Sequence, residues 1–249
     1  MSATAWLRPT YEAPYVPQTV ISLDRTAPTP ALHSSIVKLG ASPCPLSLPA
    51  LWPCPSTDLL SQVSGSTAWL SWNESGLHAL FDVRGPFLAA RDAPADKSTI
   101  HRDSRVEVFV CPAASATDPG AMCYHCYEFN SAGRCLDLLG NIDETGERHF
   151  DYEWKGSAVG VMQQLEQHDD TASVNSRLYR VSIPWQDIGL PTAPTPDDNT
   201  ELLVGVYRGE VVDAAAERAE HLWTAWVDPL SADVTFHTHR TFARVRLSR

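Results

Sequence analysis

Short runs in which hydrophobic and polar residues alternate follow one another from about residue 69 to the C-terminus. Residues 77–83 and 178–183 place an apolar side chain at nearly every second position, as expected of strands with one buried face. Residues 202–208 are almost entirely apolar, which indicates a strand in the middle of a sheet. Turn-forming residues separate these runs. The pattern therefore predicts an all-β protein, an antiparallel β-sandwich of jelly-roll or immunoglobulin-like type.

Two further β-rich runs, residues 105–110 and 124–130, are joined by a connection rich in Pro, Gly, Ala and Ser. This arrangement predicts neighbouring antiparallel strands. Because side chains alternate along a strand, Glu107 lies on the face opposite to the valines beside it, and Glu128 shares a face with Asn130. Carboxylates at such positions belong either to a solvated outer face, which is common in antiparallel sheets, or to the floor of a binding site.

The first 60 residues differ from the rest, because they contain 10 of the 19 prolines. Proline lacks an N–H donor, so this arm cannot form long helices or central strands. Residues 19–23 and 35–39 are candidates for short edge strands. The arm also contains large aromatic residues, so we expect it to pack on the body. The prediction is a single domain over residues 1–249, with a Pro-rich arm at 1–60 and the sandwich core at 61–249.

One segment departs from the strand pattern. Residues 211–222 read V-V-D-A-A-A-E-R-A-E-H-L, an order that favours helix. We expect a short helix there, or a partly ordered loop, before the final hairpin. The predicted fold therefore includes one or two short helices.

The charge balance excludes several kinds of partner. Lys and Arg total 19 against 30 Asp and Glu, a formal net charge of −11, and no basic patch is visible. Nucleic acids and membranes are therefore not expected partners, and the pattern carries no signal for an oligomeric state. The first residues lack a charged region followed by an apolar run. The six cysteines are then expected to be reduced and the protein to be cytoplasmic.

Four motifs in a fixed order resemble those of carbohydrate-binding module family 9-like domains. They are D-S-R-V-E-V-F-V at 103–110, Y-E-F-N-S-A-G at 127–133, I-P-W-Q-D-I-G-L at 183–190, and the ending from Trp223 to Leu247 that contains F-H-T-H-R. The resemblance covers residues 69–247. It implies a β-sandwich that binds a small polar or glycan-like ligand, in a pocket between the mid-chain and C-terminal hairpins, without chemistry.

The same resemblance implies a set of ligand-binding residues. Sugar-binding members hold the ligand between two tryptophans, whereas the matching positions here are Ile100 or His101, and Phe236. Glu128 stands near the position of the family's ligand-binding arginine. The ligand-binding residues implied for this chain are Glu107, Glu128, Asn130, Trp226, Phe236 and Arg240. Calcium is common in the family, so calcium is a possible cofactor here, with Asp24, Asp103, Asp137 and Asp143 as candidate oxygen ligands.

Histidines support an alternative function. His101, His125, His237 and His239 all fall on segments that the resemblance brings to one end or face of the sandwich. Histidine titrates near neutral pH, so these residues, together with glutamate, are candidate acid and base groups of an intracellular small-molecule isomerase, cyclase or lyase. On a strand, His237 and His239 would point the same way and could share a metal ion. They could equally be a hydrogen-bonding staple of the hairpin. A third alternative is a haem-binding domain with two histidine ligands.

Overall fold

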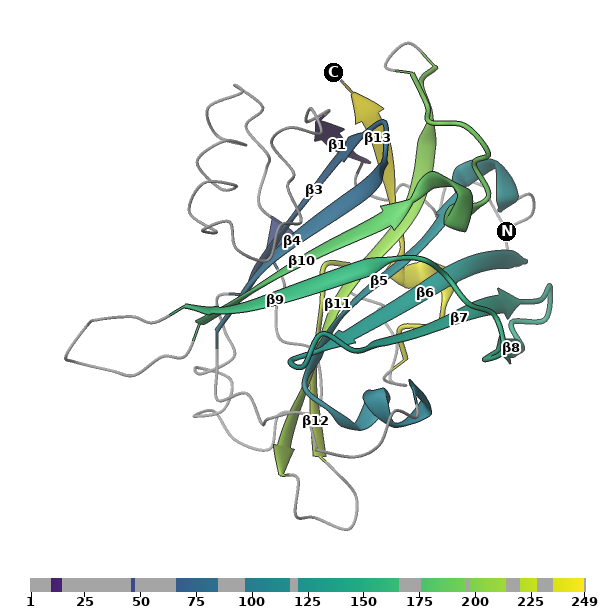
Figure 1. Cartoon of the computed structure of the whole chain (residues 1–249). Helices are drawn as coiled ribbons and strands as arrows, with labels where there is room; N and C mark the ends of the chain where they lie inside the picture. The colour runs from purple at the N-terminus through teal and green to yellow at the C-terminus, as the bar shows by residue number, and fades with distance from the viewer. Residues whose placement is uncertain are drawn as a thin grey trace.

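The computed structural model describes residues 10–14, 46–47, 66–84, 97–116, 121–165, 176–195, 198–213, 220–227 and 235–248. These residues form two sheets that pack face to face (Figure 1). The predicted all-β sandwich is thereby confirmed. In this part of the chain the helices are 3-10 turns: η2 (Lys97–Arg102), η3 (Ala113–Ser115), η4 (Trp185–Ile188) and η5 (His239–Thr241).

The larger sheet contains eight strands in the order β1-β13-β11-β5-β6-β7-β8, with β12 also paired to β11. Their bounds are β1 Thr10–Pro14, β5 Arg105–Pro112, β6 Met122–Asn130, β7 Cys135–Ile142, β8 Arg148–Asp151, β11 Glu201–Asp213, β12 Glu220–Ala225 and β13 Ala243–Ser248. Strand β11 is central, as its apolar sequence predicted. It pairs with β5 along one edge, and β12 and β13 divide its other edge.

The smaller sheet contains five strands in the order β2-β3-β4-β10-β9. Their bounds are β2 Leu46–Ser47, β3 Thr67–Asn73, β4 Gly76–Arg84, β9 Val159–Leu165 and β10 Ser176–Pro184. Alternating residues of β3, β4 and β10 point inward to a core shared with the larger sheet. In Figure 1 strands β3, β4, β10 and β9 form the layer that lies across β11, β5, β6 and β7.

The larger sheet buries both of its faces. Val106, Val108 and Val110 of β5 join the core between the sheets, whereas Phe109 and Cys111 of the same strand belong to a second apolar cluster on the opposite face. We call that opposite face the outer face. Residues 236–242, just before β13, contribute Phe236 and Phe242 to its cluster. The possibility that this face is solvated is therefore wrong.

Two expected elements differ from the structure. Residues 211–213 continue β11 and residues 220–222 belong to β12, and these two strands pair with each other. The expected helix over 211–222 is therefore wrong at both ends, and residues 214–219 lie outside the described residues. Pairing along the sheet edge outweighs the modest helix preference of the segment. In the motif at 183–190, residues 185–188 form η4, and Gly189 ends it in the left-handed conformation with φ of 79°. Residues 117–120 of the connection between β5 and β6 lie outside the described residues.

The described parts of the N-terminal arm join the sheets. Strand β1 pairs in parallel with β13, and β2 pairs with β3. The strand candidates at 19–23 and 35–39 lie outside the described residues. A search of the described helices finds none with the length and apolar character that crossing a membrane requires.

Candidate functional site

The outer face of the larger sheet carries a buried group of three charges. Arg105 Nε donates a hydrogen bond to Glu128 Oε2 at 2.5 Å and lies 2.9 Å from Glu107 Oε1. The exposed fraction of these three residues is between 2% and 4%. Arg105 Nη1 donates to the backbone carbonyls of His101 at 2.7 Å and Asp103 at 3.2 Å. We call Arg105, Glu107 and Glu128 the charged trio.

Strand pairing brings the charged trio together. Glu107 and Glu128 face each other directly across β5 and β6, and Arg105 lies on the same face two residues before Glu107 because side chains alternate. On the adjacent strands, Gly209 lies beside Arg105 and opposite Trp223. A Cβ at residue 209 would come within 2.9 Å of both side chains. Only glycine therefore leaves room for the Arg105 guanidinium, which lies 4.7 Å from the centre of the Trp223 ring.

Burial controls the charge state of the charged trio. Removal from water, followed by the negative charge of Glu128, raises the pKa of Glu107 to about 8, although Arg105 acts in the opposite direction. Burial alone would lower the pKa of Arg105, but the two carboxylates outweigh it and raise that pKa. Burial thus favours the protonated form of Glu107 beside the Arg105 cation.

Aromatic side chains extend from the charged trio over the outer face. Trp223, which is half-buried, contacts Phe236 edge-on at 5.2 Å between ring centroids. Phe236 in turn stacks on Tyr207 at 4.2 Å. On the other side of the trio, Tyr152 follows β8 and is 47% exposed. Burial, followed by the charge of Glu128, raises the pKa of Tyr152, so the tyrosine hydroxyl lies within electrostatic range of that carboxylate.

Of the remaining ligand-binding residues implied by the motifs, Asn130 lies opposite Arg105 on the face of the charged trio, whereas Trp226 and Arg240 lie apart. Asn130 is fully buried and donates to Asp103 Oδ2 at 2.8 Å, while its own Oδ1 accepts N–H groups of the following turn. Trp226 packs against the core between the sheets, on the face away from the charged trio. Arg240 is exposed in η5. Of the implied set, the structure brings Glu107, Glu128, Asn130 and Phe236 to one face.

The four histidines occupy different environments. His237 lies on the outer face, where its ring stacks on Phe109 at 4.8 Å and its Nδ1 is hydrogen-bonded to the Tyr124 hydroxyl at 2.7 Å. Burial, with the positive charges of Arg148 and Arg105, lowers the pKa of His237 to about 4. His125 lies on the inner face of β6 against Trp154. Burial lowers its pKa as well.

The two other histidines lie in 3-10 turns. His101 is exposed in η2, and His239 begins η5. The expectation that His237 and His239 point the same way assumed a strand. That assumption is wrong, because the backbone is irregular before it enters η5.

A second buried ion pair escaped the sequence analysis. Arg208 Nη2 donates to Glu210 Oε2 at 2.6 Å, and both side chains are 1% exposed. They lie on the inner face, where Ser66 Oγ accepts from Arg208 and Ser104 Oγ donates to Glu210 at 2.8 Å. Arg and Glu inside an otherwise apolar strand were the signal. Whether Arg208 and Glu210 are buried as a pair depends on the sheet that covers this face of the strand. The sequence of the strand alone does not show that sheet.

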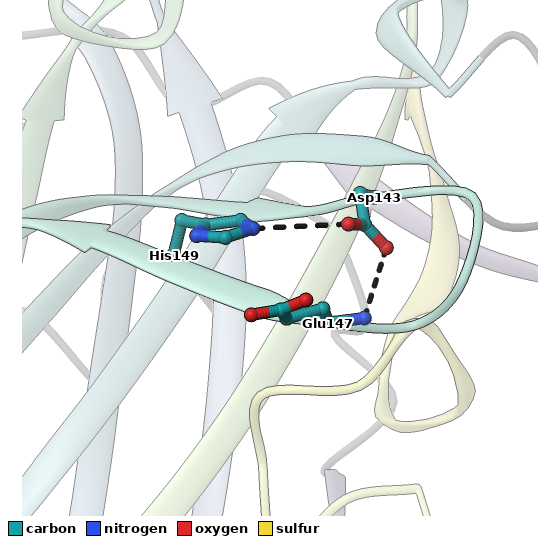
Figure 2. A group of neighbouring side chains, drawn as sticks. All are labelled: Asp143, Glu147 and His149. Atoms are coloured by element: carbon teal, nitrogen blue, oxygen red, sulfur yellow. Dashed lines mark hydrogen bonds and ion pairs between the residues drawn. The ribbon is translucent and has the colours of Figure 1, made fainter.

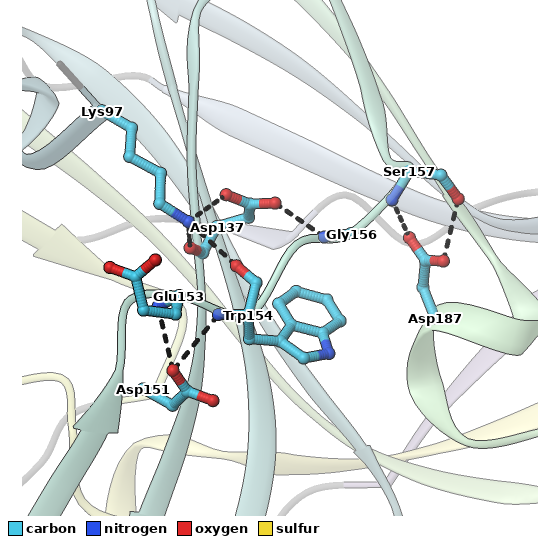
Figure 3. A network of polar contacts seen from close by, with 8 residues as sticks. All are labelled: Lys97, Asp137, Asp151, Glu153, Trp154, Gly156, Ser157 and Asp187. Carbon is cyan, nitrogen blue, oxygen red and sulfur yellow. Dashed lines mark hydrogen bonds and ion pairs between the residues drawn. The ribbon is translucent and has the colours of Figure 1, made fainter.

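Lys97 links the loop that follows β8 to strand β7 of the larger sheet. Lys97 Nζ donates to the Asp137 backbone carbonyl and carboxylate, each at 2.8 Å, and to the Trp154 carbonyl at 2.9 Å. Figure 3 shows how Gly156 N–H completes this network by donating to the same carboxylate, at 2.7 Å. The loop that follows β8 is thereby held against β7. Next to it, Asp187 accepts two hydrogen bonds from Ser157.

Replacing Lys97 with methionine is expected to lower the free energy of unfolding by about 1.5–3 kcal/mol, because three hydrogen bonds from a charged donor are lost. Lys155→Met, on an exposed residue of the same loop, is the matched control and should change it by less than about 0.5 kcal/mol. Urea denaturation of both variants measures the difference. Equal effects would contradict the role of Lys97.

Two of the candidate calcium ligands, Asp103 and Asp137, have other partners in the structure. Asp137 is neutralised by Lys97, and the Asp103 carboxylate accepts from Asn130 and lies 3.8 Å from Arg134. Calcium requires six to eight oxygen ligands. Asp24 lies outside the described residues.

Asp143 belongs to a small group of potential ligands. With Glu147 and His149 it offers ligand atoms that lie within 4.8 Å of one another, in the hairpin between β7 and β8 (Figure 2). Its Oδ1 already accepts hydrogen bonds from Thr145 and Glu147 that shape the turn. This group could hold a metal ion, and its two carboxylates would supply part of the six to eight oxygen ligands that calcium takes.

Comparison with known proteins supports the fold. No protein-family model and no curated protein matches the sequence. A Bacteroides uniformis protein whose carbohydrate binding is inferred is similar in structure, with a TM-score of 0.59 and 14% identity over 96% of this chain and 99% of that one.

A family 9 carbohydrate-binding module from Caldicellulosiruptor kristjanssonii is similar in two structures. Its complex with cellotriose has a TM-score of 0.52 and 13% identity over 96% of this chain and 94% of that one. Its complex with glucose has the same score and identity over 97% of both chains. The chain therefore has the fold of family 9 carbohydrate-binding modules, as its motifs indicated.

Proposed function

We propose that this chain binds a small saccharide on the outer face of the larger sheet, where Trp223 meets the charged trio. Sugar recognition requires a flat apolar surface for the C–H face of the ring and a few fixed polar groups for the hydroxyls. Half-buried Trp223 provides the first, and the charged trio beside it, whose residues are 2–4% exposed, fixes the position of that ring. The arrangement that carries the proposal is Arg105 packed on the Trp223 ring at 4.7 Å.

Rigid placement supports the proposal. Arg105 is held by two carboxylates and by the carbonyls of residues 101 and 103, so its orientation is set before a ligand arrives. Groups that are already ordered lose little conformational freedom on binding. Tyr152, on the far side of Glu128, is a second exposed aromatic surface on the same face. The site is thus proposed to lie between Trp223 and Tyr152.

The similar structures supply the choice of ligands. The Caldicellulosiruptor module has structures in complex with glucose and with cellotriose, so glucose and short β-glucans are the first saccharides to test. In this chain the aromatic platform comes from Trp223, which the motifs placed only at the start of the C-terminal ending.

Calorimetric titration of glucose and cellotriose into the protein tests this function. Trp223→Ala is expected to weaken binding by at least about tenfold, because the loss of a stacking aromatic removes on the order of 1.4 kcal/mol or more. Trp69→Ala, on β3 of the smaller sheet, is the control and should leave affinity unchanged. Absence of binding to a panel of mono- and disaccharides, or equal losses in the two variants, would contradict the proposal.

The enzyme alternative has less support from the geometry. The form of this alternative in which two histidines act as acid and base would need both of them in one site. His125 and His237 lie on opposite faces of the larger sheet, and the low pKa of His237 keeps it neutral at physiological pH.

A further inference from the structure

The hairpin between β7 and β8 carries three side chains that can ligate a metal ion. The carboxylates of Asp143 and Glu147 and the imidazole of His149 offer ligand atoms that all lie within 4.8 Å of one another (Figure 2). His149 Nε2 lies 3.7 Å from Asp143 Oδ2. Two ligand atoms at about 2.0–2.2 Å from one tetrahedral ion would be about 3.3–3.6 Å apart. A small shift of either side chain would therefore let the two share an ion.

The turn of this hairpin orients the Asp143 carboxylate. Its Oδ1 accepts hydrogen bonds from the backbone N–H groups of Thr145 at 2.8 Å and Glu147 at 2.9 Å, and from the Thr145 hydroxyl at 2.7 Å. Its Oδ2 faces His149 (Figure 2). Glu147 takes part in the turn through its backbone N–H, so this contact does not depend on its carboxylate. Hydrogen bonds that orient a ligating carboxylate raise metal affinity, because the ligand is already in place.

Solvent reaches the three ligands directly. The side chains of His149 and Asp143 are 57% and 37% exposed, and Glu147 is exposed as well. Arg148 lies between two of them in the sequence, but side chains alternate along β8, and Arg148 donates to Thr235 Oγ1 at 2.7 Å. An ion can therefore reach the group from the surface, without displacing a packed side chain.

We propose that Asp143, Glu147 and His149 bind a zinc ion. Zinc takes histidine nitrogen and carboxylate oxygen ligands, and a site with three protein ligands leaves its fourth position to water. Calcium takes six to eight oxygen ligands, so the histidine favours zinc. The site lies on the opposite side of β8 from the outer face, because Phe150, next to His149, packs against the cluster of the outer face. The inference is thus independent of saccharide binding.

Calorimetric titration of zinc chloride into the chelator-treated protein tests the inference. The unmodified chain is expected to bind zinc at least about tenfold more tightly than calcium. Asp143→Asn keeps an oxygen for the hydrogen bonds of the turn but replaces Oδ2, and Glu147→Gln leaves the backbone of the turn in place. Each of these variants, and His149→Ala, is expected to weaken zinc binding by about tenfold or more. Glu144→Gln, on an exposed residue of the same turn, is the control and should bind zinc as the unmodified chain does.

A spectroscopic measurement separates ligation from a general effect on folding. Zinc should shift the imidazole NMR signals of the unmodified protein that are missing from His149→Ala. Because this shift is observed in the unmodified protein, it decides the question even if a ligand variant is less stable. The inference is wrong if zinc leaves those signals unchanged, or if the ligand variants and Glu144→Gln bind zinc equally well. Tighter binding of calcium than of zinc would overturn the choice of ion.

Discussion

Replacing Arg105 with methionine is expected to lower the free energy of unfolding by about 3–5 kcal/mol at slightly alkaline pH. The substitution leaves Glu107 and Glu128 facing each other in a buried site without the cation that lies between them. It also leaves the backbone carbonyls of residues 101 and 103 without their donor. Methionine keeps most of the side-chain length, so the loss of stability reflects the missing charge more than the missing volume.

The deficit of Arg105→Met should depend on pH. In the native protein the pKa of Glu107 is raised from its ordinary value of 4.5 to about 8. A folded state that holds this proton more tightly than the unfolded state is stabilised below pH 4.5, and that stabilisation is lost as the pH rises toward 8. Without Arg105 the carboxylates are harder still to ionise. The variant should therefore recover much of its stability in mild acid.

Urea denaturation at several pH values measures this effect. Arg246→Met is the matched control, because Arg246 also lies near two carboxylates, Glu12 and Glu201, but its side chain is 46% exposed. Exposed ion pairs contribute at most about 1 kcal/mol, so the control should change little at any pH. If Arg105→Met is no less stable than Arg246→Met, then Arg105 does not hold the two buried carboxylates together.

Replacing Arg208 alone with methionine is expected to destabilise the protein by about 3–5 kcal/mol, whereas Arg208→Met combined with Glu210→Met should recover most of that loss. The single change leaves the Glu210 carboxylate without its cation between the two sheets, where both side chains of the pair are 1% exposed. The double change replaces a desolvated ion pair with apolar groups of similar length. The interaction energy between the two sites should therefore be large.

A double-mutant cycle on Arg208 and Glu210, followed by urea denaturation, gives this interaction energy. The same cycle on the exposed pair Arg244 and Glu201, which are also ion-paired, is the comparison and should give about 1 kcal/mol or less. Additive losses at Arg208 and Glu210 would mean that the pair does not form in solution. The result would also show whether the stability of this part of the core between the sheets depends on the ion pair or on apolar packing.

The mid-chain hairpin was predictable from the sequence because its pattern is local. Residues 105–110 and 124–130 alternate correctly and pair as expected, with Glu107 opposite Glu128. The candidate status of both glutamates also followed from their position inside strands. Arg105 was visible in the same strand, but its contact with both carboxylates depends on the register between β5 and β6.

Other parts of the site could not be predicted. Trp223 was one of eight tryptophans, and its place beside Arg105 depends on the pairing of β12 with β11 and on the absence of a side chain at Gly209. Trp226, three residues later, falls on the other face because side chains alternate. The helix expected at 211–222 was wrong for a related reason. Residues 211–213 and 220–222 form strands because they pair with each other, and the local helix preference does not reveal this pairing.

The sequence by itself determined that the chain forms short alternating strands, which strand is central, and which motifs resemble family 9 modules. These properties follow from residue order, because burial on one face of a strand repeats every two residues. Only the tertiary structure decided that the second face of the larger sheet is also buried, and that Arg105, Glu107, Glu128 and Trp223 meet there. The physical reason is that contacts across strands join residues far apart in the chain, and desolvation by those contacts, rather than residue type, sets the charge of the site.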